Sequence, residues 1–209
     1  MRFNHIIWDY DGTLFDTYPV MATAFRDALA DCSITEPIDT IISFMTISMG
    51  DTAKHYKEKY QLDDAFFERF TTQRKKAELE NAKPFTGIID LCHNICAHGG
   101  KNHLLTHRGE SAIHFMEKYD ILTNFTELIT AKQNFPRKPS PNAILYLIDK
   151  YSFSSDDAIM IGDRDLDVLS GKNAGIRSCY FSIQGKKSEF ADFNINCISE
   201  LNKILEIKN

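Results

Sequence analysis

Short apolar segments alternate with amphipathic helix patterns along most of this chain. Each apolar segment runs into a polar end, and the five are Arg2–Asp9, Asn102–His107, Glu127–Thr130, Asp157–Asp163 and Arg177–Phe181. The helix patterns between them are bounded in places by proline or glycine, as at Pro141 and Gly175. Strands that follow one another through helices form a parallel sheet with right-handed crossovers. The alternation therefore predicts an α/β fold with a doubly wound parallel sheet.

Residues 17–83 depart from this alternation. They carry charge-rich helix patterns and no convincing buried strand. We expect a small inserted α-helical domain over residues 17–83 and an α/β core formed by residues 1–16 and 84–209. An insertion at the carboxyl end of a strand stands near the ligand-binding edge of such a sheet, which suggests a lid. A helical elaboration that only packs on the core is the alternative.

Composition restricts the class of partner. The chain has 209 residues, a formal net charge of -5 and a pI near 5.8, which argues against general attraction to nucleic acid or acidic lipid. No apolar run approaches the roughly 20 residues that span a bilayer, and the N-terminal segment becomes charged too early for a secretory signal. We expect a cytoplasmic protein without nucleic-acid or membrane partners. Whether it is a monomer or a homodimer stays open.

Polar side chains gather at the ends of the predicted strands. The first strand leads into Asp9 and Asp11, and the second leads into Thr106. Lys138 follows the third, and the fourth leads into Asp163 with Asp167 close behind; in a parallel sheet all these ends lie at one edge. We therefore expect the six residues to converge on one site.

Several aspartates in one place require a compensating cation, because like charges raise one another's pKa values. An oxygen-only ligand set favours a hard ion, and Mg²⁺ fits a few carboxylates with several retained waters. The absence of histidine from the set disfavours zinc. The Thr106 hydroxyl and the Lys138 ammonium are donors suited to a phosphoryl group.

The spacing of these residues resembles that of a known family. Asp9–Thr13 (DYDGT), Thr106, Lys138 and Gly162–Asp167 (GDRDLD) are similar to the four motifs of the haloacid dehalogenase-like phosphatase superfamily, in the same order and at strand ends. The similarity is greatest to its phosphoglycolate phosphatase-like and β-phosphoglucomutase-like branch. It covers the core through Phe181, while the helical insertion resembles the family's cap only in position and character. A Rossmann-like core with a helical cap is the fold that the resemblance implies.

The resemblance also implies roles for individual residues. Asp9 would be the nucleophile that forms an aspartyl-phosphate, and Asp11 the general acid and base. Mg²⁺ would be held by the carboxylates of Asp9 and Asp163 and by the backbone carbonyl of Asp11. Asp167 would act from farther out or through water. Lys138 would balance the charge of the phosphate and the carboxylates.

Neighbouring residues have more ordinary interpretations. His107 is a candidate phosphate contact beside Thr106, although a histidine at a strand end is more often a hydrogen-bonded structural residue. Asp16 is predicted to cap a helix that begins near Pro19, and Asp165 to begin another helix. Thr13 is expected to hold its loop through the hydroxyl, and Arg137 to be a solvated charge.

The leading hypothesis is a Mg²⁺-dependent phosphatase that acts on a small phosphorylated metabolite. A β-phosphoglucomutase-like phosphotransferase is disfavoured by the absence of an arginine-bearing sugar loop in the helical segment. A phosphonate-cleaving hydrolase would need a helical-segment lysine, for which Lys54 is available. Non-enzymatic alternatives are a phosphorylatable receiver-like domain, which would be far shorter, and a metal-binding interaction protein.

Overall fold

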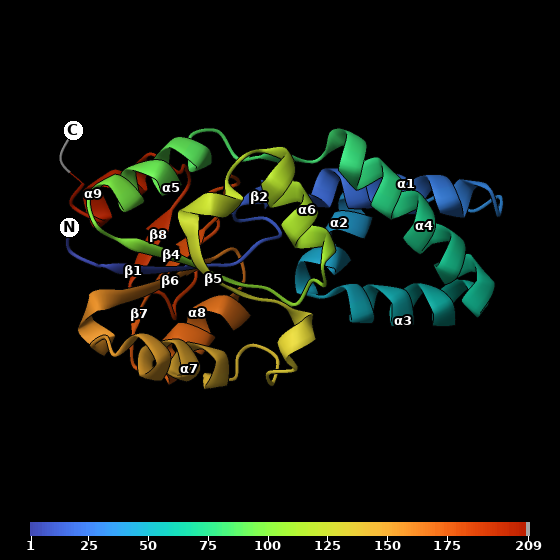
Figure 1. The fold of residues 1–209 in the computed structure, drawn as a ribbon. Helices are drawn as coiled ribbons and strands as arrows, with labels where there is room; N and C mark the ends of the chain where they lie inside the picture. The colour runs from blue at the N-terminus through green and yellow to red at the C-terminus, as the bar shows by residue number, and fades with distance from the viewer. Residues whose placement is uncertain (208–209) are drawn as a thin grey trace. The chain divides into compact units, whose positions relative to one another are not determined.

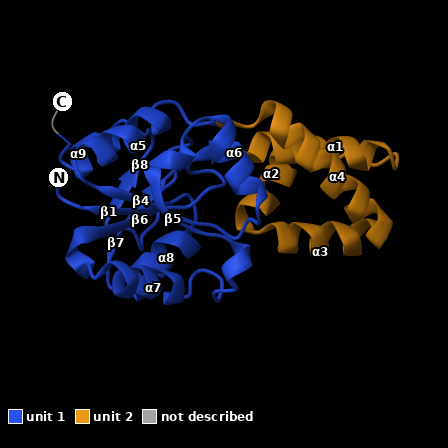
Figure 2. Cartoon of the chain, in the orientation of Figure 1, with its two compact units in different colours: residues 1–15, 84–209 blue, residues 16–83 orange. Residues whose placement is uncertain are grey.

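The computed structural model describes residues 1–207, and they form two compact units (Figure 2). One unit comprises residues 1–15 and the chain from Pro84 onward, and the other comprises residues 16–83. The chain passes between them at two short strands, β2 (Phe15–Asp16) and β3 (Lys83–Pro84), which pair as a two-stranded sheet.

The first unit is built on a six-stranded sheet in the order β5-β4-β1-β6-β7-β8, in which every neighbouring pair is parallel. Its strands are β1 (His5–Trp8), β4 (Lys101–Leu105), β5 (Phe125–Ile129), β6 (Ala158–Gly162), β7 (Arg177–Phe181) and β8 (Phe193–Ile195). From β1 the chain proceeds outward to β5, then returns to β6 on the other side and proceeds to β8. This reversal confirms the predicted doubly wound fold.

Helices lie on both faces of this sheet (Figure 1). Helices α5 (Ile88–Ala97) and α9 (Glu200–Ile204) cover one face, and α7 (Asn142–Tyr151) and α8 (Asp165–Asn173) cover the other (Figure 1). Helix α6 (Ser111–Lys118) follows β4, and short 3₁₀ turns occupy residues 122–124, 131–133 and 155–157. Two layers of helix remove both faces of the central strands from water.

Strand β1 shows how this arrangement determines the sequence of a central strand. All four of its residues are buried, and Ile6, Ile7 and Trp8 have no exposed surface. A parallel strand covered on both faces is expected to be largely apolar, and His5 is the one polar side chain of β1. Asn102 of β4 satisfies the one polar atom of Trp8, because its side-chain oxygen accepts a hydrogen bond from Trp8 Nε1 at 2.9 Å.

The second unit consists of helices, as predicted. They are α1 (Tyr18–Ala30), α2 (Ile38–Ile47), α3 (Met49–Tyr60) and α4 (Asp64–Asn81). Phe25 lies at the centre of their shared core, with its ring edge-on to those of Tyr56, Phe66 and Phe70. An aromatic core of this kind stabilises a small helical unit.

The predicted role of Asp16 as a helix cap is wrong. Asp16 belongs to β2, and the residue that precedes α1 is Thr17, which makes no capping hydrogen bond through its side chain. The pairing of β2 with β3 holds Asp16 in an extended segment, so tertiary contacts override the local capping preference. Asp165, by contrast, is the first residue of α8, as expected.

No helix within residues 1–207 has the length and apolar character needed to cross a bilayer.

Candidate active site

Asp9 comes directly after β1 and continues its pairing. The Asp9 amide donates a hydrogen bond to the Ile161 carbonyl of β6 at 2.9 Å. The chain then turns sharply, because the Tyr10 carbonyl accepts from the Phe15 amide at 3.0 Å and the Gly12 amide donates to the Phe15 carbonyl at 2.9 Å. Gly12 has a φ of 74°, a left-handed conformation that glycine adopts without strain. The turn leaves Asp9 only 1% exposed at the end of the sheet.

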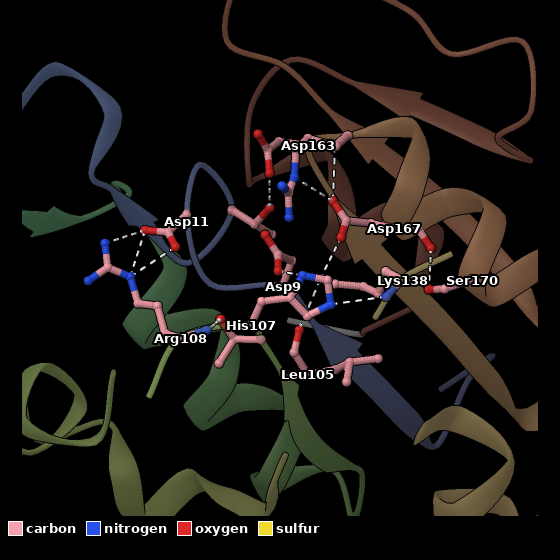
Figure 3. Close-up of polar contacts among 12 residues, drawn as sticks. Asp9, Asp11, Leu105, His107, Arg108, Lys138, Asp163, Asp167 and Ser170 are labelled. Atoms are coloured by element: carbon pink, nitrogen blue, oxygen red, sulfur yellow. Dashed lines mark hydrogen bonds and ion pairs between the residues drawn. The ribbon is translucent and has the colours of Figure 1, made fainter. Parts of the chain in front are cut away.

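Lys138 is the cation of this buried cluster (Figure 3). Its ammonium group donates to Asp9 Oδ1, lies 2.5 Å from Asp167 Oδ1 and donates to the Leu105 carbonyl at 3.1 Å. Burial by itself lowers the pKa of Lys138, but Asp167 and Asp9 outweigh it and the net shift is upward. Lys138 therefore stays charged, and it holds two carboxylates from separate elements, Asp9 after β1 and Asp167 in α8.

The negative charge of Asp9 is incompletely compensated. Burial first, and then the Asp167 carboxylate, raises the pKa of Asp9, while Lys138 lowers it; the net result is a pKa of about 6. Asp9 Oδ2 is buried and has no hydrogen-bond partner among the described residues. A buried carboxylate oxygen without a partner costs free energy, so this atom is suited to a further cation.

Three carboxylates are placed to hold such a cation. Asp9, Asp163 and Asp167 each offer an oxygen, and these atoms lie within 4.8 Å of one another. The Thr13 hydroxyl donates to Asp163 Oδ1 at 3.2 Å, and the Arg164 amide donates to Asp167 Oδ2 at 3.0 Å, so two of the carboxylates are oriented by neighbours. The donor set consists of oxygen alone and fits Mg²⁺.

Gly162 permits this close approach. A Cβ atom on Gly162 would overlap the side chain of Asp167. Glycine at the last position of β6 therefore leaves the space in which the first turn of α8 packs the Asp167 side chain against the end of this strand.

Thr106 and His107 follow β4 at the same edge. The Thr106 amide donates to the Ile129 carbonyl at 2.9 Å, and its hydroxyl accepts from the Arg108 amide at 3.1 Å. His107 Nε2 accepts from the Lys138 amide at 3.0 Å, which ties this loop to the one that carries the lysine.

His107 has the contacts of a structural residue. Burial first, then Lys138 and Arg137, lowers the pKa of His107 to about 4, so the ring is neutral. A neutral imidazole accepts at one nitrogen only, and the Lys138 amide occupies that position. The exposed Arg137 was predicted to be merely solvated, yet its Nε lies 3.3 Å from His107 Nδ1.

Sequence reasoning missed Arg108. Its Nε lies 2.9 Å from both carboxylate oxygens of Asp11, and its Nη2 donates to Asp11 Oδ1 at 2.7 Å (Figure 3). The Asp11 carboxylate is thus directed to Arg108 and is not one of the three carboxylates at the cation position. The position of Arg108, two residues after Thr106 at the end of β4, was the feature of the sequence that could have identified it as a site residue.

The fold and the site define an α/β protein of the doubly wound class, with a buried acidic site where its central strands end. The family described as haloacid dehalogenase-like hydrolase matches residues 6–181, and the chain belongs to this family.

Comparisons with individual proteins agree with that assignment. A phosphoglycolate phosphatase from Aquifex aeolicus is 25% identical, over 96% of this chain and 96% of the relative. The crystal structure of a hydrolase from Streptococcus pneumoniae TIGR4 is 30% identical with a TM-score of 0.73, and covers 99% of this chain and 100% of its own. A putative β-phosphoglucomutase from Thermotoga maritima has a TM-score of 0.83 at 19% identity, over 98% and 100% of the two chains, and shares the fold.

Proposed function

We propose that this protein is a Mg²⁺-dependent phosphatase that hydrolyses a small phosphorylated metabolite through an aspartyl-phosphate on Asp9. The observation that carries the proposal is the buried Asp9 carboxylate, which Lys138 holds beside Asp163 and Asp167. Membership of the hydrolase family and similarity to a phosphoglycolate phosphatase support the same reaction class.

The residues present fit a magnesium ion, because Asp9 Oδ2 is buried without a partner beside two further carboxylates. Asp9 and Asp163, with the Asp11 backbone carbonyl, would hold the ion, and Asp167 would support it directly or through water. When bound, the ion would neutralise negative charge on the phosphoryl oxygens and on the aspartates.

In the first half of the reaction, Asp9 attacks phosphorus. A bond forms between a carboxylate oxygen of Asp9 and phosphorus while the bond from phosphorus to the leaving oxygen breaks. Asp11 gives its proton to that leaving oxygen, so an alcohol departs. Lys138 and the Thr106 hydroxyl bind phosphoryl oxygens and hold the group in line.

In the second half, water attacks the phosphorus of the aspartyl-phosphate. Asp11, now a carboxylate, accepts a proton from the water, and the bond between phosphorus and the Asp9 oxygen breaks. Orthophosphate leaves, Asp9 is again a carboxylate, and Asp11 is again protonated. The atoms and charges therefore return to their starting state after each turnover.

We further propose that the helical segment, residues 17–83, acts as a cap that selects the substrate. The support is its position in the chain, because it is inserted directly after the loop that carries Asp9 and Asp11. Deletion of this segment is expected to change the ranking of substrates. An unchanged ranking would contradict the proposal.

The decisive experiment measures orthophosphate release from a panel of phosphorylated metabolites, with Mg²⁺ and with a chelator. We expect metal-dependent release by the wild type and a loss of more than about 1,000-fold in Asp9→Asn. Asp165→Asn is the matched control, since Asp165 is an exposed aspartate in the same motif as Asp163, and it should retain activity.

Failure of the folded wild type to release orthophosphate from any ester would contradict the proposed function, as would retention of activity in Asp9→Asn. Transfer of the phosphoryl group to another position of a sugar, in place of release, would identify a mutase.

A further inference from the structure

Arg108 makes a contact that the proposed reaction does not explain. Its guanidinium engages both oxygens of Asp11, with donor-acceptor distances of 2.7–2.9 Å. The Arg108 side chain is only 9% exposed, and the Asp11 side chain 23% exposed. An arginine and a carboxylate in this fork-shaped arrangement form a strong and geometrically specific pair.

The pair is in conflict with the role of Asp11. To protonate the leaving oxygen, a carboxyl group must point an oxygen toward it, within hydrogen-bond distance. Both oxygens of Asp11 instead face Arg108. When a substrate is bound, a second anionic group must therefore replace Asp11 at the guanidinium or share the guanidinium with it.

The location of Arg108 indicates that this second anion belongs to the substrate. In Figure 3, Asp11 and Arg108 lie on one side of Asp9, and Lys138 and Asp167 lie on the other. The ammonium of Lys138 is committed to Asp9 and Asp167, at the place where the phosphoryl group reacts. Asp11 must address the leaving oxygen, so Arg108 borders the space that receives the remainder of the substrate.

Arg108 is also held by a group other than Asp11. Its guanidinium carbon lies 5.2 Å from the centroid of the Tyr10 ring, a cation–π contact with the turn that follows β1. Its backbone amide is fixed by the Thr106 hydroxyl. These contacts keep the arginine in place when its carboxylate partner changes.

We propose that Arg108 determines specificity by binding an anionic group, such as a carboxylate or a second phosphate, on the leaving-group part of the substrate. This inference rests on the proposed function. The substrate anion replaces Asp11 in the guanidinium fork, and Asp11 then turns to the leaving oxygen. Substrates without such an anion leave Asp11 paired and react slowly.

A matched pair of esters tests the inference. 2-Phosphoglycolate carries a carboxylate where 2-hydroxyethyl phosphate carries a hydroxymethyl group. For the wild type we expect kcat/KM to be about 10- to 100-fold higher with the carboxylate, the range that one charge-assisted hydrogen-bonded pair supports. Arg108→Gln should remove this ratio, because it lowers kcat/KM with 2-phosphoglycolate and, by releasing Asp11, raises kcat/KM with 2-hydroxyethyl phosphate. Arg108→Lys should restore part of the ratio.

The matched control is Arg177→Gln. Arg177 also pairs with an aspartate, Asp192 at 2.7 Å, but it stands at the start of β7, at the opposite end of the strands from the site. This variant should keep the wild-type ratio.

Binding supplies a second readout that does not require turnover. 3-Phosphonopropionate and 3-hydroxypropylphosphonate are the non-hydrolysable counterparts of the two esters, and calorimetry with Mg²⁺ present measures their dissociation constants. The wild type should bind the carboxylate at least about 10-fold more tightly, and Arg108→Gln should bind the two alike.

Two results would overturn the inference. If Arg108 only orients Asp11, Arg108→Gln will lower kcat equally for both esters and leave the ratio of dissociation constants unchanged. Equal binding of the two phosphonates by the wild type would also overturn it. A wild type that binds 3-phosphonopropionate selectively through Arg108 but hydrolyses neither ester would instead contradict the proposed function and leave Arg108 as an anion-binding residue.

Discussion

Strands β1 and β4 carry a buried polar cluster at each end, and the two clusters differ in charge. At the carboxyl end, Asp9 is held by a charged Lys138. Toward the amino end, His5 Nδ1 lies 3.0 Å from His103 Nε2 between the two strands, with the His5 ring stacked on Phe153. Burial is the main cause that lowers the pKa of His5 to about 4 and of His103 to about 3.

The comparison shows that burial alone does not identify a functional site. The histidines respond to burial by staying neutral, and they share one hydrogen bond within a hydrophobic surround. Each cluster leaves a buried atom without a hydrogen-bond partner among the described residues, His103 Nδ1 in one and Asp9 Oδ2 in the other, but only the aspartates are charged and are kept together with a buried cation. An arrangement of charges that remains incomplete in the protein alone is the better indication of a ligand.

Removal of the buried cation should produce the largest change in stability. In Lys138→Met two buried carboxylates lose their shared partner, and we expect the free energy of unfolding to fall by about 3–5 kcal/mol. Denaturant titration measures the loss. Lys132→Met is the control, because Lys132 is 74% exposed and its surface pair with Glu110 contributes at most about 1 kcal/mol. A loss below about 1 kcal/mol in Lys138→Met would show that the cluster does not depend on the lysine.

The close packing beneath β6 should give an intermediate effect. Gly162→Ala places a methyl group against Asp167, and we expect a loss of about 1–3 kcal/mol in the free energy of unfolding. Gly109→Ala is its control, since a Cβ at Gly109 would meet no atom within 4 Å. Equal stability of the two variants would mean that the contact between Gly162 and Asp167 relaxes freely.

The histidine cluster should show itself as a smaller effect that depends on pH. Unfolded imidazoles take up protons below pH 6.5, whereas the folded pair stays neutral down to about pH 4, so stability should decrease as the pH falls through this window. Each such imidazole contributes a slope of up to about 1.4 kcal/mol per pH unit. The charged neighbours of the pair are Lys101, Asp157 and Glu127, and their contributions to the histidine pKa values are smaller than that of burial.

Urea titrations between pH 4 and 7 would measure this slope. In His103→Gln the slope of stability against pH should decrease by the contribution of one proton, up to about 1.4 kcal/mol per pH unit. Substitution of the exposed His93 by Gln should leave the slope unchanged. An unaltered slope in His103→Gln would show that the imidazole does not remain neutral in the fold.

The parallel sheet and the grouping of the main site residues could be predicted from local sequence patterns and the topology that these patterns require. Apolar segments that alternate with helices require a parallel sheet, and a parallel sheet brings its carboxyl ends to one edge. Asp9, Lys138 and Asp163 could therefore be grouped although they are distant in the chain.

The features that were missed depend on pairing in three dimensions. The contact between His5 and His103 requires the register of β1 against β4, in which His103 lies opposite Ile7. The contact between Arg108 and Asp11 depends on two loops meeting. Strand β8 and helix α9 are only three and five residues long, too short for a periodic pattern to appear.

The pairing of β2 with β3 has a consequence for how this chain can vary. Paired strands lie about 4.8 Å apart, so the first and last residues of the helical insertion are close neighbours. A segment whose two ends meet can be lengthened, shortened or exchanged without altering the path of β1 or β4. The helical segment, which we propose to take part in substrate selection, is thus encoded in a stretch of the gene that can change while Asp9 and its neighbours stay in place.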